Sequence, residues 1–181
     1  MKASKSLKVS VTALFAGLAA ILEILPLDLN FPLYEKLTLD PTGIPLALAF
    51  YMFGIDVASV ATLITGLVIA LPRPPFKGPN PIGALFKCLA ELSTLLGMYI
   101  SKRYWKSRFR TLLFSLILGV TSRVSIMTIA CIILLPLIYG LPQTLVLNTL
   151  APIVTVFNVV QGTLNIVSAY LLYESVKKRI Q

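Results

Sequence analysis

The hydropathy pattern of this chain consists of long apolar segments separated by short polar ones. A membrane-spanning helix needs about 20 predominantly apolar residues. Segments of this kind are residues 9–27, 44–54, 55–71, 81–101, 111–139 and 151–173. The second is short, and Gly54-Ile55-Asp56 beside it fits either a tight turn or a kink within one long helix. The pattern predicts an all-α integral membrane bundle, a single domain over residues 1–181, with six transmembrane helices or five as the alternative.

Two segments between the apolar stretches are too polar and turn-rich to span. In residues 30–44, NFPLYEKLTLDPTGI, prolines and a glycine interrupt regular structure, while apolar side chains offer contacts of their own. Loops of this length are often functional, so we expect either a lid folded over the bundle or a plain connector. Residues 73–81, RPPFKGPNP, form a proline-stiffened connector on the same side.

Composition and charge placement support a membrane protein with both termini in the cytoplasm. The chain is 57% hydrophobic and 13% charged, whereas soluble domains carry about a quarter charged residues, and its mean hydropathy is +0.88. The basic clusters are Lys2, Lys5 and Lys8, then Lys102, Arg103, Lys106, Arg108 and Arg110, and finally Lys177, Lys178 and Arg179. Six spans place all three clusters on one side, which the positive-inside rule makes cytoplasmic. The net charge of +9 therefore indicates contact with lipid headgroups of the cell membrane and no nucleic acid.

Several kinds of chemistry have no residues to support them. The sequence contains no histidine, which removes the commonest metal ligand and general base. Cys88 and Cys131 lie inside predicted spans, so a disulfide framework is not expected. No GxxxxGK[ST] loop is present, so the chain does not hydrolyse ATP by that route. We therefore predict a protein that is not an enzyme, with no cofactor and no metal.

The last apolar stretch carries three side-chain amides on one face. Asn158, Gln161, Gly162 and Asn165 project within a stripe of about 100° on a helix. An unpaired amide in hydrocarbon costs several kcal/mol, so the stripe must face protein or a wet cavity. It fits either hydrogen bonds between helices or a ligand site, because amides offer donors and acceptors to a heteroaromatic edge.

Charged residues also lie inside predicted spans. Lys87 and Glu91 are an i,i+4 pair in the fourth span, and Arg123 lies in the fifth at a similar depth. Charges in a bilayer normally pair or line a cavity. These three side chains are therefore interpreted either as a network that fixes the bundle or as direct ligand contacts.

Small residues cluster in the first span. Ala13, Ala16, Gly17, Ala19 and Ala20 lie close together, and Ala16 and Ala20 have a small-xxx-small spacing. Small residues let a second helix approach closely. That helix belongs either to this bundle or to a partner protein.

Four motifs, in order, resemble the substrate-binding S components of energy-coupling factor (ECF) vitamin transporters, most closely the riboflavin type. LTLDPTGIPLALAFYMFGI resembles that family's L-x-LDxxDIP segment, and GPNPIGALFKCLAE resembles its P-N-x-I-G-D segment. SRVSIMTIACIILLPLIYG resembles R-x-x-x-M-T-x-x-N, and FNVVQG resembles F-N-L-I-K-G. This chain departs from the pattern at Gly43 and Ala84, which replace aspartates, at Cys131, which replaces an asparagine, and at Gln161, which replaces a lysine.

The resemblance implies a function and a set of site residues. S components bind a vitamin, while a transmembrane coupling subunit and two ATPase subunits supply the energy and the S component topples in the membrane. Ligand-binding positions carried over from the motifs are Asn158, Gln161 and Cys131, with Leu39 and Asp40 in the first motif, and Asn165, Lys87, Glu91 and Arg123 completing the predicted site. Ala13, Ala16 and Ala20 would be the docking surface for the coupling subunit. Riboflavin is the favoured ligand, and another vitamin or flat heterocycle is the alternative.

Two functions of other classes stay open at this point. One is a membrane enzyme acting on a lipid or prenyl substrate through Lys87, Glu91 or Arg123, although paired carboxylates such as DxxxD are missing. The other is a structural subunit of a larger membrane complex, in which the buried charges serve packing only and no small molecule binds.

Overall fold

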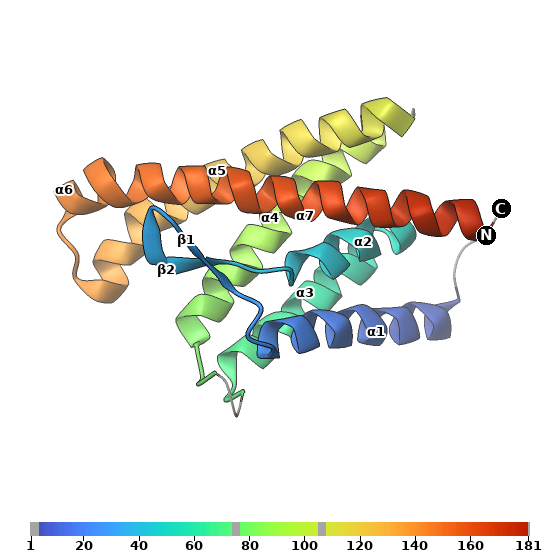
Figure 1. Ribbon diagram of the computed structural model, residues 1–181, viewed down its shortest axis with the longest axis horizontal. Helices are drawn as coiled ribbons and strands as arrows, with labels where there is room; N and C mark the ends of the chain where they lie inside the picture. Colours follow the sequence, from blue (N-terminus) through green and yellow to red (C-terminus); the bar gives the residue numbers. More distant parts are fainter. Residues whose placement is uncertain (1–3, 74–76, 105–107, 181) are drawn as a thin grey trace.

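The computed structural model describes residues 4–73, 77–104 and 108–180. These residues form a bundle of helices with one small β-hairpin (Figure 1). The elements, in chain order, are α1 (Lys5–Ile24), β1 (Leu29–Phe31), β2 (Tyr34–Leu39), α2 (Gly43–Phe53), α3 (Ile55–Ala70), α4 (Pro81–Tyr104), α5 (Arg108–Tyr139), α6 (Gln143–Leu145), the π-helical segment η1 (Val146–Leu150) and α7 (Ala151–Ile180).

Each predicted apolar stretch is helical, with ends that differ by a few residues from those predicted. Four helical stretches are long and apolar enough to cross a membrane: α1, α4, residues 110–139 of α5, and residues 143–179, which include α7. The helices α2 and α3 are shorter, at 11 and 16 residues. The last helical stretch begins earlier than predicted, because α6 and η1 run directly into α7.

A glycine turn separates α2 from α3. Gly54 has a φ of 94° and a ψ of −175°, a conformation that only glycine adopts without strain. Asp56, just after the turn, pairs with Lys8 of α1 at 3.0 Å. The predicted tight turn at Gly54 is therefore confirmed, and the described part of the chain has the six predicted helices, of which four are long and apolar enough to cross a membrane.

The segment predicted as a lid or connector contains the hairpin of β1 and β2, whose strands the sequence analysis did not predict. The two strands are antiparallel, with Leu29 opposite Leu39 and Asn30 opposite Thr38. At the tip, the ring of Phe31 meets that of Phe157 of α7 edge to face, with 5.4 Å between centroids. The hairpin is thus packed onto the bundle by an aromatic contact.

The two ends of the bundle differ in charge. Figure 1 shows the start of α1 and the ends of α4 and α7 together at one end, with the hairpin at the other. The last turns of α4 and α7 carry Lys102 and Arg103, and Lys177 to Arg179. We call these two ends the basic end and the hairpin end. Lys2 and Lys106 of the predicted basic clusters lie outside the described residues, and the cytoplasmic assignment of the basic end stays a prediction.

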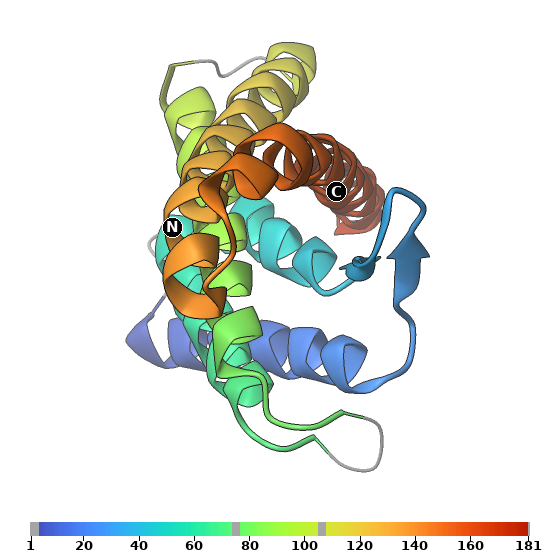
Figure 2. The same cartoon turned by 90° about the vertical axis from the view of Figure 1, so that its left-hand side faces the viewer.

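Small residues allow the helices to pack closely. Ala16 and Ala19 of α1 are buried in one core with Ala58 and Ala61 of α3. A Cβ on Gly97 of α4 would clash with the backbone of α5, so these helices cross almost in backbone contact. Figure 2 views the bundle down its long axis, with the hairpin beside the start of α2.

This packing corrects one site prediction. Ala16 was predicted to dock a partner protein, but it is only 2% exposed, because α1 packs this side against α2 and α3. Ala13 is exposed and Ala20 is half-buried. A Cβ added to Gly17 would meet nothing within 4 Å. Any docking face on α1 therefore lies along Ala13, Gly17 and Ala20 and excludes Ala16.

Candidate functional site

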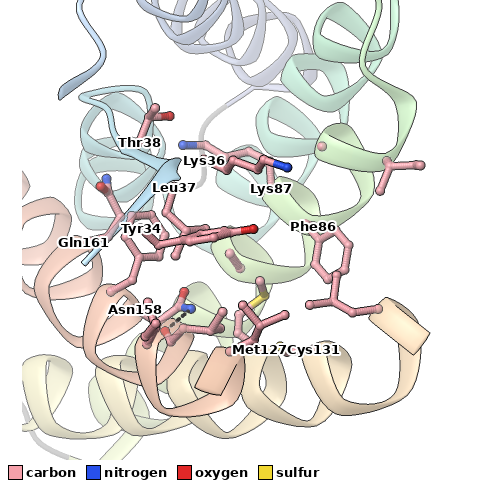
Figure 3. Close-up of a pocket in the computed structure, with 18 of the residues that line it drawn as sticks. Tyr34, Lys36, Leu37, Thr38, Phe86, Lys87, Met127, Cys131, Asn158 and Gln161 are labelled. Carbon is pink, nitrogen blue, oxygen red and sulfur yellow. Dashed lines mark hydrogen bonds between the residues drawn. The ribbon is translucent and has the colours of Figure 1, made fainter. Parts of the chain in front are cut away.

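A cavity of about 600 Å³ lies at the hairpin end, between the hairpin and helices α4, α5 and α7. Figure 3 shows side chains from all four elements around it. The polar or charged lining residues are Glu23, Lys36, Thr38, Asp40, Asn80, Lys87, Arg123, Asn158 and Gln161. The aromatic and sulfur-containing ones are Tyr34, Phe86, Met127, Cys131, Tyr139 and Phe157. The volume falls in the range of about 300–1,000 Å³ that is usual for small-molecule sites.

Gln161 fastens the base of the hairpin to α7. Its Oε1 accepts from the backbone N–H of Asp40 at 3.3 Å, and its Nε2 donates to the Asp40 carbonyl at 2.7 Å. The second Nε2 hydrogen is directed to Oδ1 of Asn165, at 3.0 Å. Both donors of this amide are therefore used within the protein.

Four buried charges form a chain beside Gln161. Lys87 Nζ contacts both carboxylate oxygens of Asp40, at 2.6 and 2.7 Å, and lies 3.8 Å from Glu91 Oε1. Arg123 Nη1 donates to the same Glu91 oxygen at 3.0 Å. Two carboxylates and two cations, none more than 14% exposed, sum to zero charge. Such a network is stable only when each charge keeps its partner, because removing one strands the other.

Arg123 is also bonded to its neighbours through other atoms. Its Nε donates to Oδ1 of Asn158 at 2.9 Å, and Nη1 donates to the hydroxyl of Thr94 at 3.2 Å. Asn158 in turn donates through Nδ2 to the carbonyl of Val154, four residues earlier in α7, at 2.8 Å. The predicted amide face of α7 and the predicted charge network are thus one hydrogen-bonded system.

The Asp40 carboxylate stays ionised at neutral pH. Burial alone would raise its pKa, but the Lys87 ammonium and hydrogen bonds from Thr42 outweigh burial, and the pKa is lowered from its ordinary value of 3.8. The Thr42 N–H donates to Asp40 Oδ1 at 2.9 Å. Asp40 therefore acts as a fixed anionic link between the hairpin and α4.

A glycine makes room for this network. A Cβ on Gly43, at the start of α2, would lie 2.8 Å from Glu91 Oε1 and would clash with the Asn165 side-chain amide. Asn165 Nδ2 donates to Glu91 at 3.2 Å. Glycine at this position therefore leaves room for Asn165 and Glu91, which a larger side chain would obstruct.

A second charge cluster closes the side of the cavity next to α1. Glu23 accepts from Arg73 and from the Thr42 hydroxyl, and Lys77 lies 2.6 Å from Asp28. Arg73 and Lys77 also form a short bridge within the predicted connector, of which residues 74–76 lie outside the described part. The connector is therefore held to the end of α1.

The remaining wall is apolar. Cys131, Val146 and Leu150 form a buried cluster against which Tyr34 packs from the hairpin. Cys131 therefore lies among hydrocarbon side chains, and a thiol in such surroundings is a weak hydrogen-bond donor. Aromatic rings from β2, α4 and α7 offer flat surfaces on which a planar ligand could stack.

The structure brings most of the predicted site residues together. Asp40, Lys87, Arg123, Cys131, Asn158 and Gln161 line the cavity. Glu91 and Asn165 lie behind them, buried and bonded to each other and to lining residues. Leu39 pairs with Leu29 in the hairpin and is not a lining residue.

Several lining residues were missed. Tyr34, Lys36 and Thr38 alternate along β2 and line the cavity together with Asp40, which was predicted. A strand directs alternate side chains to the same side, so period-two spacing in YEKLTLD was the signal available. Phe86 and Met127 carried no such signal, because apolar residues in a membrane helix are equally compatible with core packing.

Comparison with known proteins defines the fold. No family model matches the sequence, and no curated protein matches it. Among solved structures, the chain matches one described as the S component of a bacterial ECF transporter, with a TM-score of 0.80, 23% identity, and coverage of 98% of this chain and 99% of that chain. A second match is the S component for biotin from an ECF-type ABC transporter, with a TM-score of 0.60, 13% identity and 95% coverage of each chain. At these identities the likeness establishes a shared fold.

Proposed function

We propose that this chain is the substrate-binding S component of an ECF-type transporter in the cytoplasmic membrane. It binds a vitamin, with riboflavin favoured, in the cavity at the hairpin end. It delivers that ligand through a transmembrane coupling subunit powered by two ATPase subunits. The observation that carries the proposal is the cavity of about 600 Å³ inside a fold shared with a solved S component over nearly the whole chain.

The two kinds of cavity wall support a flat heterocyclic ligand. One wall presents aromatic and apolar side chains, including Tyr34, Phe86 and Phe157. The other presents Arg123, Asn158 and Lys87, which are held in place by the buried network. A planar ring system with polar atoms on one edge uses both walls, since pockets of this kind bind by apolar contact and orient by a few polar groups.

The roles of the predicted ligand contacts differ from the family pattern. Asn158 keeps one amide hydrogen beyond the bond to Val154. Gln161 spends both of its donors inside the protein, and Cys131 lies in an apolar cluster. Riboflavin would therefore make fewer hydrogen bonds at the α5–α7 wall than the family pattern implies, and a related flat heterocycle is the alternative ligand.

A surface on α1 suits docking by the coupling subunit. Ala13, Gly17 and Ala20 are at least partly accessible on the outer side of α1, and the large residues Leu14, Leu18 and Ile21 beside them are exposed. Small residues flanked by large apolar ones allow close helix packing within a membrane. The proposal assigns this face to the coupling subunit.

The decisive experiment is a riboflavin titration of the protein purified in mild detergent, followed by quenching of flavin fluorescence. We expect saturable quenching at nanomolar flavin, or a yellow protein that retains flavin through purification. A colourless protein that does not quench riboflavin but is thermally stabilised by another vitamin would contradict the flavin assignment alone. A protein that no vitamin stabilises would contradict the transport function as well.

The docking face is tested by Gly17→Leu. Space is open at this position, so riboflavin binding should be unchanged while vitamin uptake with the coupling subunit and ATPases falls at least about tenfold, since close helix approach is blocked. Ser125→Leu, at an exposed position of α5, is the matched control and should leave uptake unchanged. Full uptake by Gly17→Leu would rule out this face.

A further inference from the structure

We infer that Arg123 is the ligand's principal hydrogen-bond donor, and that it receives an uncharged acceptor, a carbonyl oxygen or a ring nitrogen. This inference rests on the proposed function, because it concerns the same cavity. The inference names the atom of the wall that recognises the ligand. It also specifies the net charge of the ligands that the cavity accepts.

Two other polar side chains of this wall already use their donors within the protein. Gln161 uses both N–H groups on Asp40 and Asn165. Lys87 directs its ammonium to the two oxygens of Asp40 and towards Glu91. An ammonium has three donors, of which two are bonded to Asp40, and the nearby Glu91 holds the charge at ion-pair distance. Neither side chain can serve a ligand without giving up a hydrogen bond or an ion-pair contact within the protein.

Arg123 differs, because a guanidinium has five N–H donors and only part of them is used. Nε donates to Asn158, and Nη1 donates to Glu91 and Thr94. Among the described residues no acceptor is bonded to Nη2. Nη2 is also not enclosed by protein atoms, since it is absent from the set of enclosed polar atoms without a partner. Arg123 lines the cavity. The side chain is only 2% exposed, so the accessible part of this buried cation faces the cavity.

The charge balance of the network selects the kind of acceptor. Asp40 and Glu91 already neutralise Lys87 and Arg123, and Lys36, a further cation that lines the cavity, is exposed to solvent. A carboxylate or phosphate placed on Arg123 would add a third negative charge close to Glu91, whose Oε1 is 3.0 Å from Nη1. A cationic ring would face the two existing cations. In a site of low dielectric either excess charge is costly, whereas a neutral carbonyl accepts from Nη2 and leaves the sum at zero.

The test compares riboflavin with analogues in which sulfur replaces one carbonyl oxygen of the pyrimidine ring, since sulfur is a weak acceptor. Isothermal titration should show wild-type protein binding at least one of the 2-thio and 4-thio analogues about 10- to 100-fold more weakly than riboflavin, the range for a bond to a charged donor. Arg123→Lys keeps the charge but lacks the forked second nitrogen, and it should lose this preference. Arg110→Lys, at an exposed position of the same helix, should keep it.

Equal weakening of riboflavin and both analogues in Arg123→Lys would overturn the inference, because a purely structural role cannot distinguish oxygen from sulfur. If Arg123→Lys does not fold, the same comparison is made with Asn158→Ala. An oxygen preference that survives there supports Arg123 as the donor, and its loss overturns the assignment in favour of Asn158.

A vitamin panel separates this inference from the proposed function. If flavins do not bind and an uncharged vitamin raises the melting temperature, the flavin assignment fails and the charge-class inference stands. If biotin, a carboxylate, or thiamine, a cation, stabilises the protein, the inference is overturned while the S-component function stands.

Discussion

The helix α7 and the segment around α2 contact each other in two regions of different chemistry. Near the hairpin end, Gln161 pairs with the backbone of Asp40, and Asn165 fills the space over Gly43. Towards the basic end, the ring of Tyr51 in α2 stacks on Tyr173 at 5.7 Å and meets Tyr170 edge to face at 5.6 Å. One region is joined by directional hydrogen bonds and the other by packed rings.

The difference explains why the cavity lies where it does. Hydrogen bonds hold side chains in fixed directions without filling the volume around them, so the hairpin region stays stable beside a cavity. Aromatic rings stabilise mainly by filling space. The polar region is therefore suited to the proposed ligand recognition, and the aromatic region to holding the two helices together.

The largest expected effect comes from removing a charge from the polar region. Glu91→Leu leaves Arg123 and Lys87 without a shared partner, and losing one partner of a buried pair costs about 3–5 kcal/mol. Thermal unfolding in detergent measures this loss. Asp56→Asn, which breaks the exposed pair with Lys8, is the control and should cost no more than about 1 kcal/mol. Similar losses in the two variants would contradict the importance assigned to the network.

Gly43→Ala should destabilise the same region by a smaller amount. The new methyl would overlap Asn165 and press on Glu91, and overpacking of this kind typically costs about 1–3 kcal/mol. Gly17→Ala, where space is open, should be neutral or stabilise α1 by up to about 1 kcal/mol through helix propensity. A neutral Gly43→Ala would show that Asn165 can move aside.

Asp40→Asn should cost roughly 1–2 kcal/mol through the weaker bond to Lys87, and this cost should depend on pH. Because the pKa of Asp40 is lowered from 3.8, its contribution to stability is complete above that value and is lost as the pH falls through the lowered pKa. The stability difference between wild type and Asp40→Asn should therefore be constant from about pH 8 to pH 5 and shrink below about pH 4. A difference that changes near neutral pH would contradict this assignment.

The smallest effect is expected in the aromatic region. The hydroxyl of Tyr51 is buried beside Ser115 and makes no hydrogen bond of good geometry within the described residues, so Tyr51→Phe keeps the ring and removes at most a weak polar contact. We expect a change in stability within about 1 kcal/mol, neutral or favourable. A clear loss of stability would mean that this region also depends on polar contacts.

Sequence patterns predicted the helices well, because hydrophobic length alone determines where a chain can span a bilayer. They predicted the partners of polar residues less well. Asn158, Gln161 and Arg123 were identified as functional candidates, yet the partner of Gln161 is the backbone of Asp40, 121 residues away. Nothing local specifies such a pair. The small residues of α1 show the same limit, since Ala16 and Gly17 look alike in sequence but face opposite environments.

The zero sum of the buried charges also constrains how this chain can evolve. Compared with the flavin-type pattern, it lacks an aspartate at Gly43, which borders Glu91 and Asn165, and a lysine at Gln161, which borders Asp40. Together these two departures remove one negative and one positive charge from adjoining positions. A chain that departed from this pattern at only one of the two positions would carry an unbalanced buried charge. Homologues are therefore expected to covary at these two positions, so that an acid at the first accompanies a base at the second.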